Sequence, residues 1–287
     1  VGGKDQPGPA APELEQWNKR LPSTGPPVRL VARWAAPAKD NERRLRLEWP
    51  TTAKTNDFFA HHHGNDWQIG PQHKTISVDE GRIVIEKTVK FFEGKWPTHI
   101  SGLVVKFDAD PKHPSAIVVS APIQPEAAPL KIGGNLRDSL TGGATLTGRS
   151  FGLGAGFGAA PPNSIPGLAL DADATPPGSL VTAIFTFKIA DHWHMYWRNP
   201  GNAAGLPPSF KFNLPPGISA EPEAIRWPLP AKKSFPSLTR EGETDFGYEY
   251  DGEIAFLIPL QVADDVAPGE YDLRIDAKWI ECQDDEV

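Results

Sequence analysis

The sequence is poor in several features that would have pointed to a function. Cys282 is the only cysteine among 287 residues, so no disulfide can form within the chain. The longest apolar runs, 181–187 and 255–260, have the length of a strand and fall short of the roughly 20 residues that cross a bilayer. Lys and Arg number 29 against 36 Asp and Glu, and the resulting net charge of −7 argues against a nucleic-acid-binding surface, which would need clustered Lys and Arg.

Proline and glycine, in contrast, are abundant, at 31 and 27 residues, which favours short strands and turns over long helices. One short helix is predicted at 12–21, between Pro12 and Pro22. Alternating patterns predict strands at 28–34, 43–49, 75–78, 82–92, 101–107, 116–123, 179–189, 209–214, 224–229, 253–262 and 270–280. Because no amphipathic helices separate these strands, the predicted fold class is all-β, with two immunoglobulin-like β-sandwich domains joined by a Gly/Pro-rich linker.

The composition changes along the chain and predicts four segments. Residues 1–26 are a Pro/Gly-rich leader with the short helix, and 27–125 are the first β-sandwich. Residues 126–178 are the Gly/Pro-rich linker, and 179–287 are the second β-sandwich, which we expect to be truncated at its C-terminal end. The chain starts with VGGKDQ, without an initiator Met, which is typical of a processed or excised piece.

The position of Cys282 follows from the last predicted strand, where odd-numbered residues from Tyr271 to Trp279 are apolar and even-numbered ones are charged. Cys282 therefore falls on the outer face, unless a bulge intervenes. The alternative is a small buried hydrophobe. Neighbouring carboxylates disfavour an attacking thiolate but are compatible with a sulfur that is attacked as half of a disulfide. These carboxylates are those of Glu281, Asp284, Asp285 and Glu286.

Five sequence elements occur in an order that resembles a known family. They are HWHMYWRNPG (192–201), GLPP (205–208), IRWPLP (225–230), FGYEYDG (246–252) and AKWIEC (277–282). Together they resemble the periplasmic N-terminal domain of DsbD-type and ScsB-type thiol:disulfide interchange proteins. Residues 12–123 resemble, more weakly, the second β domain of the longer members, which there follows the cysteine-bearing domain. Tandem copies and a rearranged order both remain open explanations.

The resemblance implies protein-disulfide reductase chemistry within a larger membrane-anchored periplasmic protein, of a kind linked to cytochrome c biogenesis. Electrons pass from a membrane-embedded redox domain to periplasmic thioredoxin-like partners through two cysteines, and no cofactor is needed because sulfur carries the electrons. Only Cys282 is present as a catalytic residue, so we expect the second cysteine past Val287, unless it is lost. The family also implies an aromatic cap on a loop, which here would be Phe246, Tyr248 and Tyr250, and a structural motif consisting of Trp193, Tyr196, Trp197, Arg198, Asn199, Pro200 and Gly201.

Two other interpretations compete with a redox relay. A non-catalytic immunoglobulin-like binding module of an extracytoplasmic protein would leave Cys282 as a structural remnant. A metal site would use His192 and His194, two imidazoles predicted on one strand face. No cysteine lies nearby, and Trp193, Met195 and Trp197 form an apolar row on the same strand, so a structural role is favoured and no metal is expected. The histidines at 61–63 are predicted to lie in an exposed loop.

Overall fold

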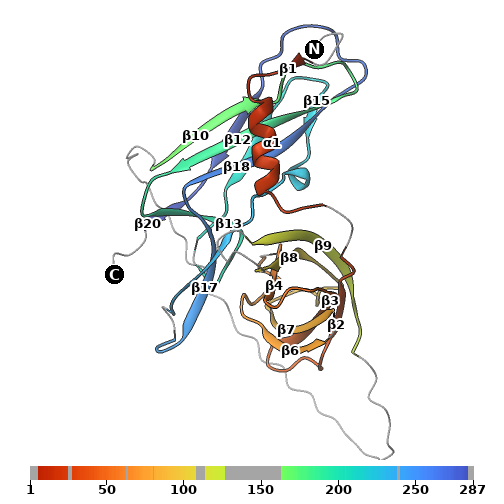
Figure 1. The fold of residues 1–287 in the computed structure, drawn as a ribbon, viewed down its shortest axis with the longest axis vertical. Helices are drawn as coiled ribbons and strands as arrows, with labels where there is room; N and C mark the ends of the chain where they lie inside the picture. The colour runs from red at the N-terminus through yellow and green to blue at the C-terminus, as the bar shows by residue number, and fades with distance from the viewer. Residues whose placement is uncertain are drawn as a thin grey trace, which may run out of the picture.

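The computed structural model describes residues 6–24, 28–62, 64–79, 81–107, 114–126, 163–203, 205–237 and 240–283. Figure 1 shows a first β unit in orange and olive below a second unit in green and blue. The first unit forms an eight-stranded sheet in the order β4-β8-β9-β2-β3-β7-β5, with β6 on the side of β7. Its strands are β2 (Val31–Trp34), β3 (Glu42–Pro50), β4 (Asn56–Ala60), β5 (Trp67–Ile69), β6 (Lys74–Asp79), β7 (Arg82–Phe91), β8 (His99–Lys106) and β9 (Ser115–Gln124).

Alternation of side chains produces the core of the first unit. In β3, Leu45, Leu47 and Trp49 are fully buried, whereas the residues between them are partly exposed. The same alternation in β7 buries Ile83 and Ile85. Burying each large apolar side chain contributes about 1.5–3 kcal/mol, so these inward rows fix which face of each strand turns inward.

The second unit is built from several smaller sheets. One sheet has the order β10-β12-β18-β15 and another the order β16-β17-β13-β20, with the pairs β14-β19 and β1-β11 beside them. A single 3-10 turn, η1 (Pro222–Ala224), precedes β16. The strands are β1 (Gln6–Pro7), β10 (Ser164–Leu170), β11 (Ala172–Ala174), β12 (Leu180–Ile189), β13 (Trp193–Gly201), β14 (Ser209–Asn213), β15 (Ile218–Ala220), β16 (Ala231–Pro236), β17 (Thr244–Tyr250), β18 (Glu253–Val262), β19 (Arg274–Lys278) and β20 (Glu281–Gln283).

The helix predicted near the N-terminus is present as α1 (Ala11–Arg20), with a proline in its first turn. It crosses the sheet of β10, β12 and β18 in Figure 1. Trp17 belongs to one apolar cluster with Ile184 of β12 and Leu257 of β18. The N-terminal segment therefore contributes to the packing of the second unit, from which it is separated in the sequence by the whole first unit.

The two units share a hydrophobic core. Phe59 of β4 in the first unit belongs to the same buried cluster as Trp197 and Tyr248 of the second. The ring centroid of Phe59 lies 4.5 Å from that of Tyr248 and 6.4 Å from that of Trp197. Aromatic pairs at such distances add to the stabilisation from burial, so separating the units would expose a substantial apolar surface.

The all-β fold class predicted from the sequence is confirmed, and the strands predicted at 28–34 and 43–49 are present as β2 and β3, which pair with each other. One predicted strand is wrong, and another is longer than the strand observed. Residues 224–229 contain the end of a 3-10 turn and one isolated bridge, between Arg226 and Leu257. The predicted strand 270–280 is ordered as a strand only over β19. Most of the predicted linker lies outside the described residues, but its last part forms β10 and β11. Among the described residues, no helix is long and apolar enough to span a bilayer.

Candidate functional site

Cys282 lies on β20, the edge strand of its sheet, and its side chain is partly exposed. The preceding strand, β19, pairs with β14, but β20 pairs with β13, so the chain changes partner strand across residues 279–280. In the new register Cys282 stands directly opposite His194. Side chains of directly paired residues project on the same face of a sheet, so the thiol and the imidazole are neighbours.

The face that carries Cys282 lies opposite the hydrophobic core. Met195 and Trp197 of β13 point into the core and are almost fully buried. His194 and Tyr196 alternate with them and therefore occupy the other face, where His194 Nε2 lies 3.0 Å from the Tyr196 hydroxyl and 3.9 Å from Glu249 Oε1. The outer-face position that strand alternation predicted for Cys282 agrees with this register.

Glu281, the acidic neighbour of Cys282, has a structural contact. Its Oε1 accepts a hydrogen bond of 2.6 Å from the backbone N–H of Asn163, the residue before β10. This bond connects β20 to the start of an edge strand in the other sheet. The other three acidic residues expected near the thiol, Asp284, Asp285 and Glu286, lie outside the described residues.

The proposed aromatic cap needs a correction. Phe246, Tyr248 and Tyr250 lie on β17 and not on a loop. Tyr250 is paired with Met195, so it projects toward the core, and its hydroxyl donates a hydrogen bond of 2.9 Å to the Pro228 carbonyl. Tyr248 is also in the core, and burial raises the pKa of both tyrosines. These two rings pack on the face opposite Cys282 and do not cover the thiol.

The end of the motif strand, in contrast, faces the first unit. Asn199 is buried, and its amide donates hydrogen bonds of 2.9 Å to the Ala60 carbonyl and 3.2 Å to the His62 carbonyl. Its Oδ1 accepts a bond of 2.9 Å from the Gly201 N–H. Gly201 has φ of +73°, and a Cβ there would lie 2.5 Å from the Phe246 carbonyl oxygen, so glycine is required. The motif thus links the cysteine sheet to the first unit.

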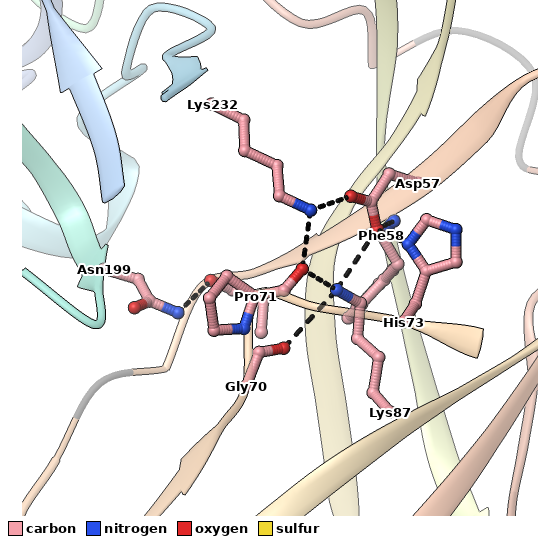
Figure 2. A network of polar contacts seen from close by, with 9 residues as sticks. Asp57, Phe58, Gly70, Pro71, His73, Lys87, Asn199 and Lys232 are labelled. Carbon is pink, nitrogen blue, oxygen red and sulfur yellow. Dashed lines mark hydrogen bonds and ion pairs between the residues drawn. The ribbon is translucent and has the colours of Figure 1, made fainter. Parts of the chain in front are cut away.

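A buried ionic network, drawn in Figure 2, reinforces the same contact between the units. Asp57 of β4 is 3% exposed, and its Oδ1 lies 3.1 Å from the Nζ of Lys87 and 3.0 Å from the Nδ1 of His73. Its Oδ2 lies 2.7 Å from the Nζ of Lys232, which belongs to the second unit. Both lysines also donate hydrogen bonds to the Pro71 carbonyl, at 2.9 and 2.7 Å.

The electrostatics of the network follow from its burial. Burial alone would raise the pKa of Asp57, but Lys87, the hydrogen bond from His73 and Lys232 together hold it well below its usual value. Burial lowers the pKa of Lys87 to about 8, in spite of the adjacent Asp57. The carboxylate is therefore ionised at neutral pH and shared by two cations from two units.

Sequence reasoning missed this network, although one signal was available. Lys87 occupies the inward row of β7, in line with Ile83, Ile85 and Val89, where a charged residue requires a partner. Nothing in the sequence identified that partner as Asp57.

The two histidines considered for a metal do not share a strand face. His192 lies in the turn before β13 with φ of +66°, and His194 lies within the strand. Within the described ranges, no three His, Cys, Asp or Glu residues are grouped as metal ligands would be. His61, which was predicted to lie in an exposed loop at 61–63, packs edge-on against Trp197, with the ring centroids 5.7 Å apart. His63 lies outside the described residues.

Comparison with known proteins gives one family match, over the second unit. Residues 168–287, which make up less than half of the chain, match the family described as thiol:disulfide interchange protein DsbD, N-terminal. No curated protein matches the chain. Among solved structures, the N-terminal periplasmic domain of ScsB from Proteus mirabilis matches at 10% identity over 90% of this chain and 92% of that one, with a TM-score of 0.18. A TM-score this low carries no structural argument.

Proposed function

We propose that the second unit is an extracytoplasmic thiol–disulfide exchange domain in which Cys282 is the reacting sulfur. The observation that carries the proposal is the position of Cys282 within a DsbD-type domain: it lies on an edge strand, partly exposed, on the face away from the core. An edge strand leaves one side open for another protein to approach, and exchange requires that an incoming sulfur reach the disulfide in line.

The exchange step proceeds through a mixed disulfide. A thiolate of one protein attacks the disulfide of the other, one S–S bond forms between Cys282 and the partner as another breaks, and the displaced sulfur leaves as a thiolate. A complete two-electron cycle requires a second thiol, and the 287 residues contain only Cys282. In the proposed relay this thiol belongs to a second cysteine in the parent protein.

The proposed partners follow from this chemistry and from the domain type. A membrane-embedded redox domain of the parent protein, or of a partner chain, supplies electrons. Thioredoxin-like periplasmic proteins receive them, because such proteins carry an exposed pair of cysteines whose disulfide is reduced to two thiols by way of a mixed disulfide. The proposed location is accordingly periplasmic, and the first unit holds the redox unit in a fixed orientation through the shared core and the Asp57 network.

Trapping of a mixed disulfide tests the proposal. The chain is incubated with a thioredoxin-fold protein whose resolving cysteine is replaced by serine and whose remaining cysteine is activated with thionitrobenzoate; the complex is then quantified by intact mass. We expect a covalent one-to-one complex through Cys282 and none with Cys282→Ser. The matched control places a cysteine at exposed Ser209, on β14 of the same unit, in the Cys282→Ser background.

The comparison of rates distinguishes exchange from simple thiol exposure. Complex formation at Cys282 should be faster than at the control cysteine, after correction for their rates with a small disulfide. Equal corrected rates would favour the alternative of a non-catalytic binding module, in which Cys282 has no partner preference.

A further inference from the structure

A cavity of about 290 Å³ lies where the N-terminal segment, the first unit and the second unit meet. Its walls include Leu21 after α1, Leu103 of β8, and Trp197, Ile225 and Trp227 of the second unit. It lies apart from Cys282, because neither the cysteine nor another residue of β20 lines it. The volume is close to the lower end of small-molecule sites, which begin at about 300 Å³.

Arg198 and Arg226 are the two cationic residues of the cavity wall. Among the described residues, no carboxylate forms an ion pair with Arg198 within 4.0 Å and no acceptor forms a hydrogen bond with its guanidinium. Its Cζ lies over the Trp227 ring, 5.6 Å from the ring centroid. Burial lowers the pKa of Arg198, although Tyr250 and Glu223 act in the opposite direction. A guanidinium remains charged in proteins, so the cavity wall carries a partly desolvated cation that Glu223 influences from a distance but that no carboxylate of the described residues contacts within ion-pair distance.

Two other wall residues complement this cation. The indole N–H of Trp197 is buried and has no acceptor among the described residues. Burial, aided by Arg198, lowers the pKa of His61 to about 3, so His61 is neutral at physiological pH and offers one N–H or one lone pair without adding charge. The second arginine of the wall, Arg226, is already engaged, because its Nη1 donates a bond of 2.6 Å to Asn18 Oδ1.

We propose that this cavity binds a small organic carboxylate with a flat apolar body. Arg198 pairs with the carboxylate, for which a guanidinium provides two parallel donors, and the body lies among Trp197, Trp227 and the aliphatic wall. Exposed Glu223 stands at the same cavity and disfavours any anion there, so it limits the affinity. The site lies between the units and is independent of the thiol chemistry proposed for Cys282.

The test is calorimetric titration of the full chain with benzoate, with benzamide as the neutral analogue of the same shape and inorganic phosphate as an anion without an apolar body. We expect saturable one-to-one binding of benzoate with a dissociation constant of about 1 mM or lower. Benzamide and phosphate should bind at least about tenfold more weakly, as the loss of a charge-assisted pair or of the apolar contact requires.

Two variants assign the site. Arg198→Gln should weaken benzoate binding at least about tenfold, whereas Arg33→Gln, on the surface of the first unit, should leave it unchanged. Glu223→Gln keeps Arg198 and should tighten binding by about twofold, an effect that added salt diminishes. If Arg198→Gln does not fold, the Glu223→Gln result decides.

Three outcomes would overturn the proposal. The first is the absence of saturable benzoate binding. The second is equal binding of benzoate and benzamide, or of benzoate and phosphate, because the charge or the apolar body would then be irrelevant. The third is benzoate affinity that neither Arg198→Gln nor Glu223→Gln changes. None of these results depends on the reactivity of Cys282.

Discussion

Substitution of Asp57 by Asn should be among the most destabilising changes of one functional group in this protein. The side chain keeps its shape, but the two lysine Nζ atoms at 3.1 and 2.7 Å lose their shared anion. Lys87 is only 1% exposed and cannot reach water. Breaking a buried ion pair by removing one partner costs about 3–5 kcal/mol, because the remaining charge is left uncompensated.

The free energy needed to neutralise Lys87 gives a separate upper bound on the destabilisation by Asp57→Asn. A lysine forced to be neutral at pH 7 in the folded state, with an unfolded pKa of 10.5, costs about 3.5 pKa units, or about 5 kcal/mol. The remaining hydrogen bonds to the Pro71 and Gly70 carbonyls reduce this cost. We therefore expect Asp57→Asn to lower the free energy of unfolding by about 3–5 kcal/mol.

Urea unfolding at pH 7, followed by tryptophan fluorescence and circular dichroism, measures this loss. Glu15→Gln is the matched control, because it removes an exposed i,i+4 pair with Lys19 and should cost no more than about 0.5 kcal/mol. The double variant Asp57→Asn/Lys87→Met should recover part of the loss, since it leaves no buried charge at position 87. An Asp57→Asn protein within about 1 kcal/mol of the wild type, at unchanged urea dependence, would refute the reasoning.

Three further predictions concern the interface and the motif strand. The pKa of Lys87 is about 8 in the folded state and 10.5 in the unfolded state, so the unfolded state binds more protons between these two pH values. The free energy of unfolding of the wild type, relative to that of Lys87→Met, should therefore rise from about pH 8 to 10.5. If urea unfolding gives the two proteins the same pH dependence, the prediction is contradicted. Asn199→Ala leaves the Ala60 carbonyl without its 2.9 Å donor and should cost about 1–3 kcal/mol in urea unfolding, whereas a neutral result would mean that water replaces the amide. Gly205→Ala would place a Cβ 1.9 Å from the Tyr196 ring and should lower the free energy of unfolding by about 1–3 kcal/mol. The NMR signals of the Tyr196 ring should shift as well, and an unchanged spectrum would show that residue 205 does not contact the ring.

Local patterns predicted much of the fold. Apolar residues alternate with polar ones in β3 and β7, and prolines flank or begin α1. These are short-range patterns that predict a strand or a helix whichever segment packs against it. The position of Cys282 was predictable for the same reason. Even-numbered residues face away from the core in β19 and again in β20, and the pairing of Cys282 with His194 agrees with this.

Contacts between distant segments were not predictable in this way. Asp57 and Lys232 are separated by 175 positions, and no local pattern indicates that their strands meet. The aromatic residues of β17 read as a loop because a glycine and several charged residues surround them, but pairing with β13 and burial of Tyr248 and Tyr250 made this segment a strand. Tertiary contacts overrode local propensity there, and this is why Tyr248 and Tyr250 lie in the core.

The most direct test of the central claim is a redox titration of Cys282 in the parent protein, taken in the longest form that its gene encodes. The protein is equilibrated in glutathione buffers of stepped potential, alkylated, and the thiol state of Cys282 is read by peptide mass spectrometry. An exchange domain predicts that Cys282 passes reversibly from thiol to a disulfide with another protein cysteine at one defined potential. A Cys282 that stays free at every potential, or forms only a glutathione adduct, would contradict the proposed function.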